Sequence, residues 1–287
     1  MAIKILNGKE AASELQKGLR VSLEELNTKP FLATVLVGEN SPSEIYVRIK
    51  KRACEKIGIT NEIYRFNNDE TSKDLRNFIS FLNHDREVHG ILIQLPLPPK
   101  YNELETVQSV NPRKDVDGFH FNNVGKLACG FEDRPGIYYP ATPAGILALL
   151  KHFCIPLAKT YSVVVGRSNI VGRPLSRLLE LHNSTVTLCH SKTQEIPRFT
   201  READILISAV GQENFITKDM VKKGSTIIDV GTNRRKDGSL TGDVDFENVK
   251  DIAGAISPSP GGVGPMTVTM LMHNVIQACK YLEEKYN

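Results

Sequence analysis

Tyr46 and Lys50 are four residues apart in a segment with helical spacing, Ser43–Ile57. Their side chains would therefore project from one face of a helix, about one turn apart. A tyrosine ring offers a flat surface for an aromatic ligand, and a partly buried lysine can take part in proton transfer. A solvated lysine on a helix surface explains the same pattern without any chemistry.

Gln94 and Asp117 are two further polar residues at positions where ligands often bind. Gln94 ends the apolar run GILIQLPLPP, and the carboxyl ends of parallel strands are common ligand sites. Asp115 and Asp117 flank a valine in PRKDVDGFH, so one can face a ligand while the other caps a turn. A carboxylate suits a guanidine-like edge, such as the amino-pyrimidinone of a pterin. A glutamine satisfied by backbone amides and an aspartate that only caps a turn remain open alternatives.

Residues 161–174, YSVVVGRSNIVGRP, have the pattern of a phosphate-binding loop. A β-branched strand ends in Gly166, and Gly172 and Pro174 let the backbone come close and a helix begin. The spacing departs from the usual G-x-G-x-x-G of dinucleotide sites. Glycines that serve only packing would be the alternative.

The end of the next expected strand favours NADP over NAD. That strand, Thr185–Cys189, is followed by His190, Ser191 and Lys192, with no carboxylate to bond the ribose hydroxyls. Arg167 and Ser191 are therefore the expected ligands of the 2′-phosphate.

Two glycine-containing stretches and one rigid loop complete the candidate sites. Gly211 follows one later strand and Thr232, in DVGTN, ends another, so both are expected on the nicotinamide side. The loop SPSPGGVGPMT, residues 257–267, combines prolines that fix its shape with glycines that let a ligand approach the backbone.

Helix-like and strand-like segments alternate through both halves, which predicts an α/β fold of two lobes built from parallel βαβ units around a cleft. We place a first domain at residues 1–140 and a Rossmann-type NADP-binding domain at 141–267. Residues 268–287 form an apolar helix expected to return to the first lobe. Residues 111–140, rich in Gly, Pro, Asn and Asp, are expected to be loop.

Composition describes a globular protein of 287 residues with 40% hydrophobic and 24% charged residues. A net charge of +3 gives no argument for a nucleic-acid partner. No apolar run is long enough for a membrane span or signal peptide, so we expect a cytoplasmic protein. The five cysteines are scattered, which favours neither disulfides nor zinc, and no metal is expected.

The ordered motifs over residues 3–280 resemble the bifunctional methylenetetrahydrofolate dehydrogenase/methenyltetrahydrofolate cyclohydrolase family. These motifs are SEIYVRIKKRACEKIGI, GILIQLPLP, PRKDVDGFH, VVGRSNIVGRP, TVTLCHSKT, IIDVGTN and SPSPGGVGPMT. The chain differs at Ala141 and Ser259, where the family commonly has cysteine and valine. Neither change removes a catalytic group, and Ser259 is a candidate to adjust substrate or inhibitor affinity.

The resemblance implies roles for individual residues. Lys50 is the catalytic lysine, Tyr46 stacks on the folate, Gln94 works beside Lys50, and Asp117 anchors the pterin. The other expected folate contacts are Leu95, Pro258, Pro260, Gly261 and Gly262. The expected cofactor contacts are Gly166, Arg167, Ser168, Ser191, Gly211 and Thr232.

The resemblance also implies a homodimer paired through the NADP lobe and a two-step reaction. Methylenetetrahydrofolate passes a hydride to NADP, and water then opens the methenyl product to 10-formyltetrahydrofolate. Two alternatives are an NADP dehydrogenase acting on another small substrate and a nucleotide-sensing module without turnover. The presence of Lys50 argues against both of these alternative functions.

Overall fold

The computed structural model describes residues 3–38, 41–67, 70–131 and 134–286. The chain divides into two compact units. Leu15–Ala141 and Val268–Asn287 form one, here called the three-stranded unit. Met1–Glu14 and Thr142–Thr267 form the other, the six-stranded unit.

The three-stranded unit has a parallel sheet of order β3-β2-β4, with β2 at Phe31–Val37, β3 at Thr60–Phe66 and β4 at Gly90–Ile93. The central strand β2 is apolar except for the buried Thr34, as expected of a strand covered on both faces. Leu32 packs into one core cluster, together with residues of α2 (Ser41–Ile57) and α10 (Val263–Tyr286). Ala33, Val35 and Val37 pack into another, together with α3 (Ser72–His84).

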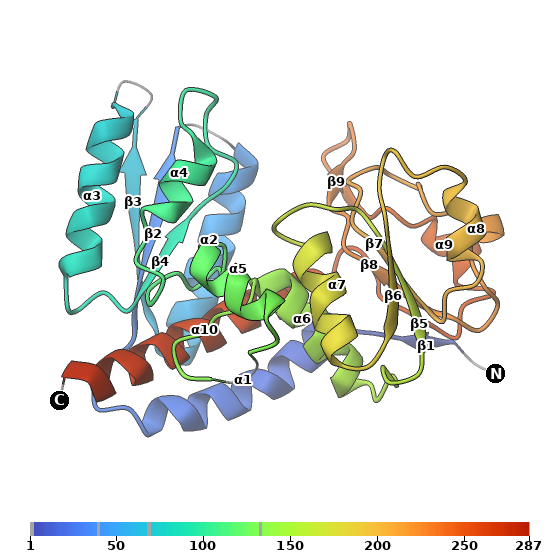
Figure 1. Cartoon of the computed structure of the whole chain (residues 1–287), viewed down its shortest axis with the longest axis horizontal. Helices are drawn as coiled ribbons and strands as arrows, with labels where there is room; N and C mark the ends of the chain where they lie inside the picture. The colour runs from blue at the N-terminus through green and yellow to red at the C-terminus, as the bar shows by residue number, and fades with distance from the viewer. Residues whose placement is uncertain (1–2, 39–40, 68–69, 132–133, 287) are drawn as a thin grey trace. The chain divides into compact units, whose positions relative to one another are not determined.

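Two long helices support this unit from opposite ends of the chain. Figure 1 shows α1 (Gly8–Glu24, blue) and α10 (red) side by side, and Gln16 Nε2 of α1 donates to Thr269 Oγ1 of α10 at 3.0 Å. Leu19 of α1 and Leu271 of α10 belong to one core cluster. The C-terminal helix thus returns to the first lobe, as the sequence predicts.

The six-stranded unit has the strand order β1-β11-β8-β7-β5-β6, and every pairing is parallel. Its main strands are β5 (Tyr161–Val165), β6 (Thr185–Cys189), β7 (Ile205–Ser208) and β8 (Thr226–Asp229). The helices are α6 (Ala141–His152), α7 (Gly172–Leu181), α8 (Ile196–Thr200) and α9 (Phe246–Val249), with a 3₁₀ turn at Lys218–Met220. Strand order reverses beside β5, whose neighbours are β6 and β7, and such switch points bind ligands at the carboxyl ends of the strands.

The N-terminus corrects the predicted first domain. β1 (Lys4–Ile5) pairs with β11 (Ala255–Ile256), so residues 3–14 belong with the six-stranded unit and not with a domain of residues 1–140. Strands of two residues carry no readable periodicity, and only their pairing reveals them. Residues 1, 2 and 287, at the ends of the predicted segments, lie outside the described part of the chain.

Other short elements also escape the sequence pattern. α4 (Glu103–Gln108) was not expected, and α5 (Phe121–Ala128) lies inside the segment expected to be loop. A hairpin of β9 (Asn233–Arg234) and β10 (Leu240–Thr241) follows β8. Among the described helices, none combines the length and apolar character needed to cross a membrane.

Candidate active site

Lys50 and Gln94 come together in the three-stranded unit. Gln94 directly follows β4, and its backbone N–H still donates to Val35 O at 2.9 Å, which fixes it to the sheet. Lys50 Nζ, on α2, donates to Gln94 Oε1 at 3.1 Å, while Gln94 Nε2 donates to Leu95 O at 2.8 Å. The half-buried Lys50 therefore has a fixed partner, unlike a solvated surface lysine.

Besides Lys50, this site contains a second charged group, the carboxylate of Asp117. Burial raises the pKa of Asp117 to about 6; the positive charge of Lys50 acts in the opposite direction, and Asp115 raises the pKa further. Such mutual effects require charges that lie close together. Within the described residues, no donor is hydrogen-bonded to this carboxylate, which leaves its oxygens available to a ligand.

Of the two aspartates in PRKDVDGFH, Asp115 is the one that caps a turn. Its carboxylate accepts hydrogen bonds from Phe119 N at 3.2 Å, His120 N at 2.8 Å and Asn123 Nδ2 at 2.8 Å. Asp115 thus fixes the turn that carries Asp117.

The backbone around Asp117 is also fixed from the C-terminal helix. Asn274 Nδ2 of α10 donates to Val116 O at 2.8 Å and to Tyr139 O at 3.0 Å. Gly118 has φ +71, and a Cβ there would lie 2.6 Å from Tyr138 O. Only glycine allows this close approach of the two chain segments. Asn274 gave no signal in the sequence, because its contacts are more than a hundred residues away.

Tyr46 completes the group on the N-terminal side of Lys50. It lies one helical turn earlier on α2 and is 40% exposed, so its ring can receive a flat ligand. The three-stranded unit therefore offers a ring, an ammonium, a carboxamide and a carboxylate, of which Lys50, Gln94 and Asp117 interact directly or through their charges.

The loop after β5 depends on two glycines. Gly166 has φ +123, and a Cβ there would lie 2.3 Å from Ala209 O. A Cβ on Gly172 would lie 1.7 Å from Gly166 O, so the start of α7 packs directly on the loop backbone. Ser168 Oγ accepts from Val171 N at 3.1 Å and so helps to shape the turn. A loop that brings backbone N–H groups to a helix N-terminus is suited to phosphate.

A cavity of about 400 Å³ opens at the carboxyl ends of β5, β6 and β7. Arg167 and Ser191 both line it, although they follow different strands, β5 and β6. None of the described residues lining it is acidic. A cation and a hydroxyl beside a glycine loop fit a phosphorylated nucleotide. The full lining is Val165, Gly166, Arg167, His190, Ser191, Ile196, Ala209, Val210, Gln212 and Phe215.

The other expected cofactor residues do not line this cavity. Ser168, Gly211 and Thr232 are exposed and absent from the lining. Sequence reasoning missed Ile196, Gln212 and Phe215, which follow β6 and β7 without a motif of their own.

The proline and glycine loop before α10 belongs to the six-stranded unit, as do the expected folate residues Pro258, Pro260, Gly261 and Gly262. The loop is closed by Gly262 N, which donates to Pro258 O at 2.8 Å. A Cβ on Gly8 would lie 1.6 Å from Gly262 O, so α1 begins in direct contact with it. Ser259 Oγ donates to Gly231 O at 2.7 Å, while the other family departure, Ala141, is buried at the start of α6.

A metal site finds no support in the described residues, since no group of three or more His, Cys, Asp or Glu residues gathers there. The candidate groups for chemistry are Lys50, Gln94 and Asp117 in one unit and the lining of the β5–β7 cavity in the other.

Comparisons with known proteins agree with this arrangement. Residues 6–117 match the family model described as tetrahydrofolate dehydrogenase/cyclohydrolase, catalytic domain, and residues 140–283 match that family's NAD(P)-binding domain. The bifunctional protein FolD of Anoxybacillus flavithermus is 46% identical over 283 residues, which cover 98% of this chain and 99% of that protein.

Two solved structures have the same fold over nearly the whole chain. The bifunctional methylenetetrahydrofolate dehydrogenase/cyclohydrolase FolD of Campylobacter jejuni superposes with a TM-score of 0.94 at 42% identity, covering 97% of this chain and 99% of that one. The enzyme of Trypanosoma brucei, complexed with NADP cofactor and an inhibitor, gives 0.91 at 32% identity and covers 97% of each chain.

Proposed function

The chain belongs to the tetrahydrofolate dehydrogenase/cyclohydrolase family, and on that basis we propose that it is a bifunctional enzyme of one-carbon metabolism. It oxidises 5,10-methylenetetrahydrofolate with NADP to 5,10-methenyltetrahydrofolate and hydrolyses this product to 10-formyltetrahydrofolate. The observation that carries the proposal is the hydrogen bond between Lys50 and Gln94 beside Asp117, because it holds an ammonium group where the second reaction needs one.

The three-stranded unit holds the folate in this proposal. Asp117 accepts N–H groups from the amino-pyrimidinone edge of the pterin, since its oxygens have no donor in the described structure. Tyr46 stacks against the aromatic part of the substrate, and Leu95 lines the same site. In the six-stranded unit, Pro258, Pro260, Gly261 and Gly262 form a rigid loop that is also assigned to folate binding.

Lys50 and Gln94 carry out the hydrolytic step. Gln94 accepts one of the three N–H bonds of the Lys50 ammonium and so fixes its direction. Water adds to the methenyl carbon, one C–N bond then breaks, and the ring nitrogen gains a proton. Lys50 orients the water and handles the protons around this tetrahedral intermediate.

NADP supplies the hydride acceptor, and the six-stranded unit binds it. Arg167 and Ser191 hold the 2′-phosphate, because they line one cavity in which no described lining residue is acidic. Gly166 and Ser168 shape the phosphate loop, while Gly211 and Thr232 contact the nicotinamide end. The protein's part in hydride transfer is orientation.

The assembly proposed for the enzyme is a cytoplasmic homodimer paired through the six-stranded unit. Strand β6 lies at the end of the sheet order, and its residues 186–188 are half-buried within one chain. An edge strand of this kind can be covered by a second copy. Neither nucleic acid nor membrane is part of the proposal.

A two-channel spectrophotometric assay tests the function. With methylenetetrahydrofolate and NADP, we expect NADPH to form and methenyltetrahydrofolate to appear and then decay to the 10-formyl product. Methenyltetrahydrofolate supplied without NADP should also be hydrolysed. NADPH formation without any enzyme-dependent hydrolysis would reduce the assignment to a dehydrogenase, and absence of both would refute it.

A further inference from the structure

Asp243 is fully buried, and its carboxylate accepts five hydrogen bonds, all from uncharged groups. Its position follows directly from the β9–β10 hairpin, which brings Gly242 and Asp243 beside the chain after β8. The donors are Ser208 Oγ at 3.2 Å, Val210 N at 2.7 Å, Gly211 N at 3.2 Å, Gln212 N at 3.0 Å and Asn233 Nδ2 at 3.0 Å.

Three of these donors are consecutive backbone N–H groups in the loop after β7. Residues 210–212 turn around the carboxylate, and Gly211 adopts φ +70 to allow the turn. Ala209, Val210 and Gln212 also line the cavity that contains Arg167 and Ser191. The carboxylate of Asp243 therefore determines the path of one wall of that cavity, although Asp243 itself does not line it.

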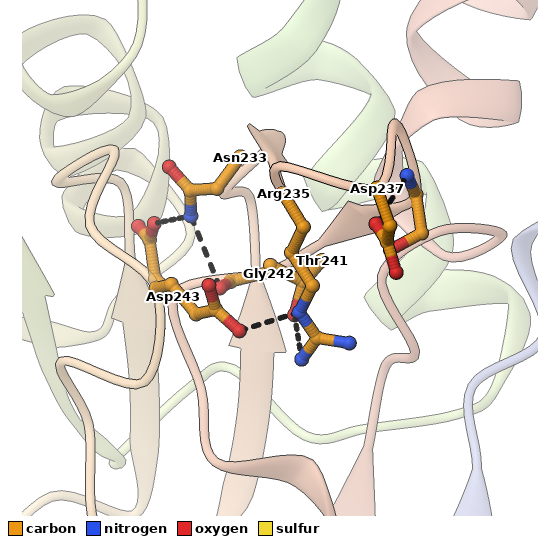
Figure 2. Close-up of polar contacts among 8 residues, drawn as sticks. Asn233, Arg235, Asp237, Thr241, Gly242 and Asp243 are labelled. Atoms are coloured by element: carbon orange, nitrogen blue, oxygen red, sulfur yellow. Dashed lines mark hydrogen bonds and ion pairs between the residues drawn. The ribbon is translucent and has the colours of Figure 1, made fainter.

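Asn233 connects the same carboxylate to the chain that carries Thr232. Figure 2 shows the Asn233 amide between Gly242 and Asp243, where Nδ2 donates to Gly242 O and to Asp243 Oδ1, each at 3.0 Å. In the same hairpin, Arg235 Nε donates to Glu213 Oε1 at 2.6 Å, and Glu213 follows β7. The hairpin is thus bonded to the segment that follows β7.

The carboxylate of Asp229 fixes the backbone at Asp243. Asp229 Oδ1 accepts from Asp243 N and Gly231 N, each at 2.9 Å, and Asp229 Oδ2 accepts from Val244 N at 3.1 Å. A Cβ on Gly231 would lie 2.2 Å from Asp243 Oδ1, and one on Gly242 would lie 1.7 Å from Asp229 Oδ2. Glycine at both positions lets the two carboxylates fit against the opposing backbones.

We infer that Asp243 is a positioning residue for the dinucleotide site, which holds the 209–212 wall and the Thr232 segment in the geometry that binds NADP. This inference rests on the proposed function, because it takes the cavity at β5–β7 to be the NADP site. Asp243 acts through backbone groups and makes no contact with the cofactor.

Asp243→Asn is the direct test, because it keeps the size of the side chain and replaces one acceptor by an NH₂ group that faces N–H donors. We expect the NADP dissociation constant, measured by calorimetry without folate, to rise about ten- to a hundredfold. The loosened 209–212 wall must be ordered again when NADP binds, at a cost comparable to the internal charge-assisted hydrogen bond that is lost. The matched control is Asp237→Asn in the turn of the same hairpin, where the carboxylate accepts hydrogen bonds from the N–H and the hydroxyl of Ser239. The control should bind NADP like the wild type.

Steady-state kinetics distinguish positioning from general destabilisation. Positioning predicts a raised KM for NADP, an unchanged KM for methylenetetrahydrofolate and a kcat close to wild type at saturating NADP. A destabilised protein would instead lose kcat with both KM values unchanged, and that result would overturn the inference.

A second variant covers the case in which Asp243→Asn does not fold. Asn233→Ala removes two hydrogen bonds and leaves the Asp243 carboxylate with its other four donors, so a several-fold rise in the NADP dissociation constant is expected. A folded Asn233→Ala protein with wild-type NADP affinity would decide against positioning. Wild-type protein that neither binds nor turns over NADP would instead refute the proposed function itself.

Discussion

Lys50 is the side chain on which the proposed hydrolysis depends most directly. Lys50→Met keeps a long apolar stem on α2 and removes the ammonium group that donates to Gln94. Cyclohydrolase activity should fall at least about a hundredfold, the usual contribution of general acid–base catalysis. Some dehydrogenase activity should survive, because hydride transfer depends on orientation, and methenyltetrahydrofolate should then accumulate.

The matched control is the neighbouring Lys51→Met, whose ammonium pairs with Glu55 on the same helix. It should leave both activities unchanged. A folded Lys50→Met enzyme that still binds NADP and hydrolyses methenyltetrahydrofolate at the wild-type rate would remove Lys50 from the mechanism.

Asp117 should lower the stability of the folded protein at neutral pH while it contributes to substrate binding. Burial raises its pKa to about 6, so the folded state holds its proton more tightly than the unfolded chain, and this group's contribution to stability decreases as pH rises between about 4 and 6. Asp117→Asn should therefore raise the free energy of unfolding at pH 7 by at most about 3 kcal/mol, and by much less at pH 4.5. Denaturant titrations at both pH values measure this difference.

The same variant should bind folate more weakly, because an amide has only part of the accepting capacity of a carboxylate. The KM for methylenetetrahydrofolate should rise while the affinity for NADP stays constant. If Asp117→Asn lowers stability at pH 7 and leaves the folate KM unchanged, Asp117 serves the turn and not the pterin.

Arg167 should distinguish NADP from NAD. Arg167→Ala removes a cation from the lining of the β5–β7 cavity, so affinity for NADP should fall about ten- to a hundredfold while that for NAD changes little. Arg173→Ala is the control, since Arg173 bonds Asn169 outside that lining. Equal losses for both cofactors would mean that Arg167 shapes the loop without reading the phosphate.

At the scale of elements, the junction between the phosphate loop and α7 is a tightly constrained part of the six-stranded unit. A Cβ on Gly172 would lie 1.7 Å from Gly166 O, and backbone cannot yield to it as a flexible side chain would. Gly172→Ala should therefore shift the loop, lower the melting temperature and weaken NADP binding, as thermal melts and calorimetry will show.

Gly18→Ala provides the contrast within a helix. Gly18 is an exposed position of α1, where an added Cβ would meet nothing within 4 Å. Alanine there should stabilise the protein by roughly 0.5–1 kcal/mol through helix propensity. If both variants behave alike, the contact between Gly172 and Gly166 does not govern the loop.

At the scale of the whole molecule, the proposed homodimer has a simple signature. Sedimentation equilibrium at micromolar protein should give about twice the 31.9 kDa mass of one chain. The half-buried edge strand β6 supports this expectation, because a second copy can cover it. A single-chain mass across that concentration range would contradict the homodimer.

The sequence by itself determined the fold class, the parallel βαβ repeats and the family. These follow from local signals: buried β-branched strands such as Val163–Val165, glycines where two backbones meet, and motifs whose residues are close neighbours in the chain. The helical spacing that places Tyr46 and Lys50 on one face is a signal of the same kind. None of these signals requires knowledge of contacts between residues that are far apart in the sequence.

Only the tertiary structure decided which residues interact across long stretches of chain. Three such interactions join segments that no periodicity connects: the pairing of Lys50 with Gln94, the hydrogen bond from Asn274 to the backbone of Val116, and the network around Asp243. Strand β1 shows the same limit, because its two residues acquire a place only by pairing with β11. Asp115 and Asp117 are alike in sequence, and burial and hydrogen bonding alone assign one to the turn and leave the other to a ligand.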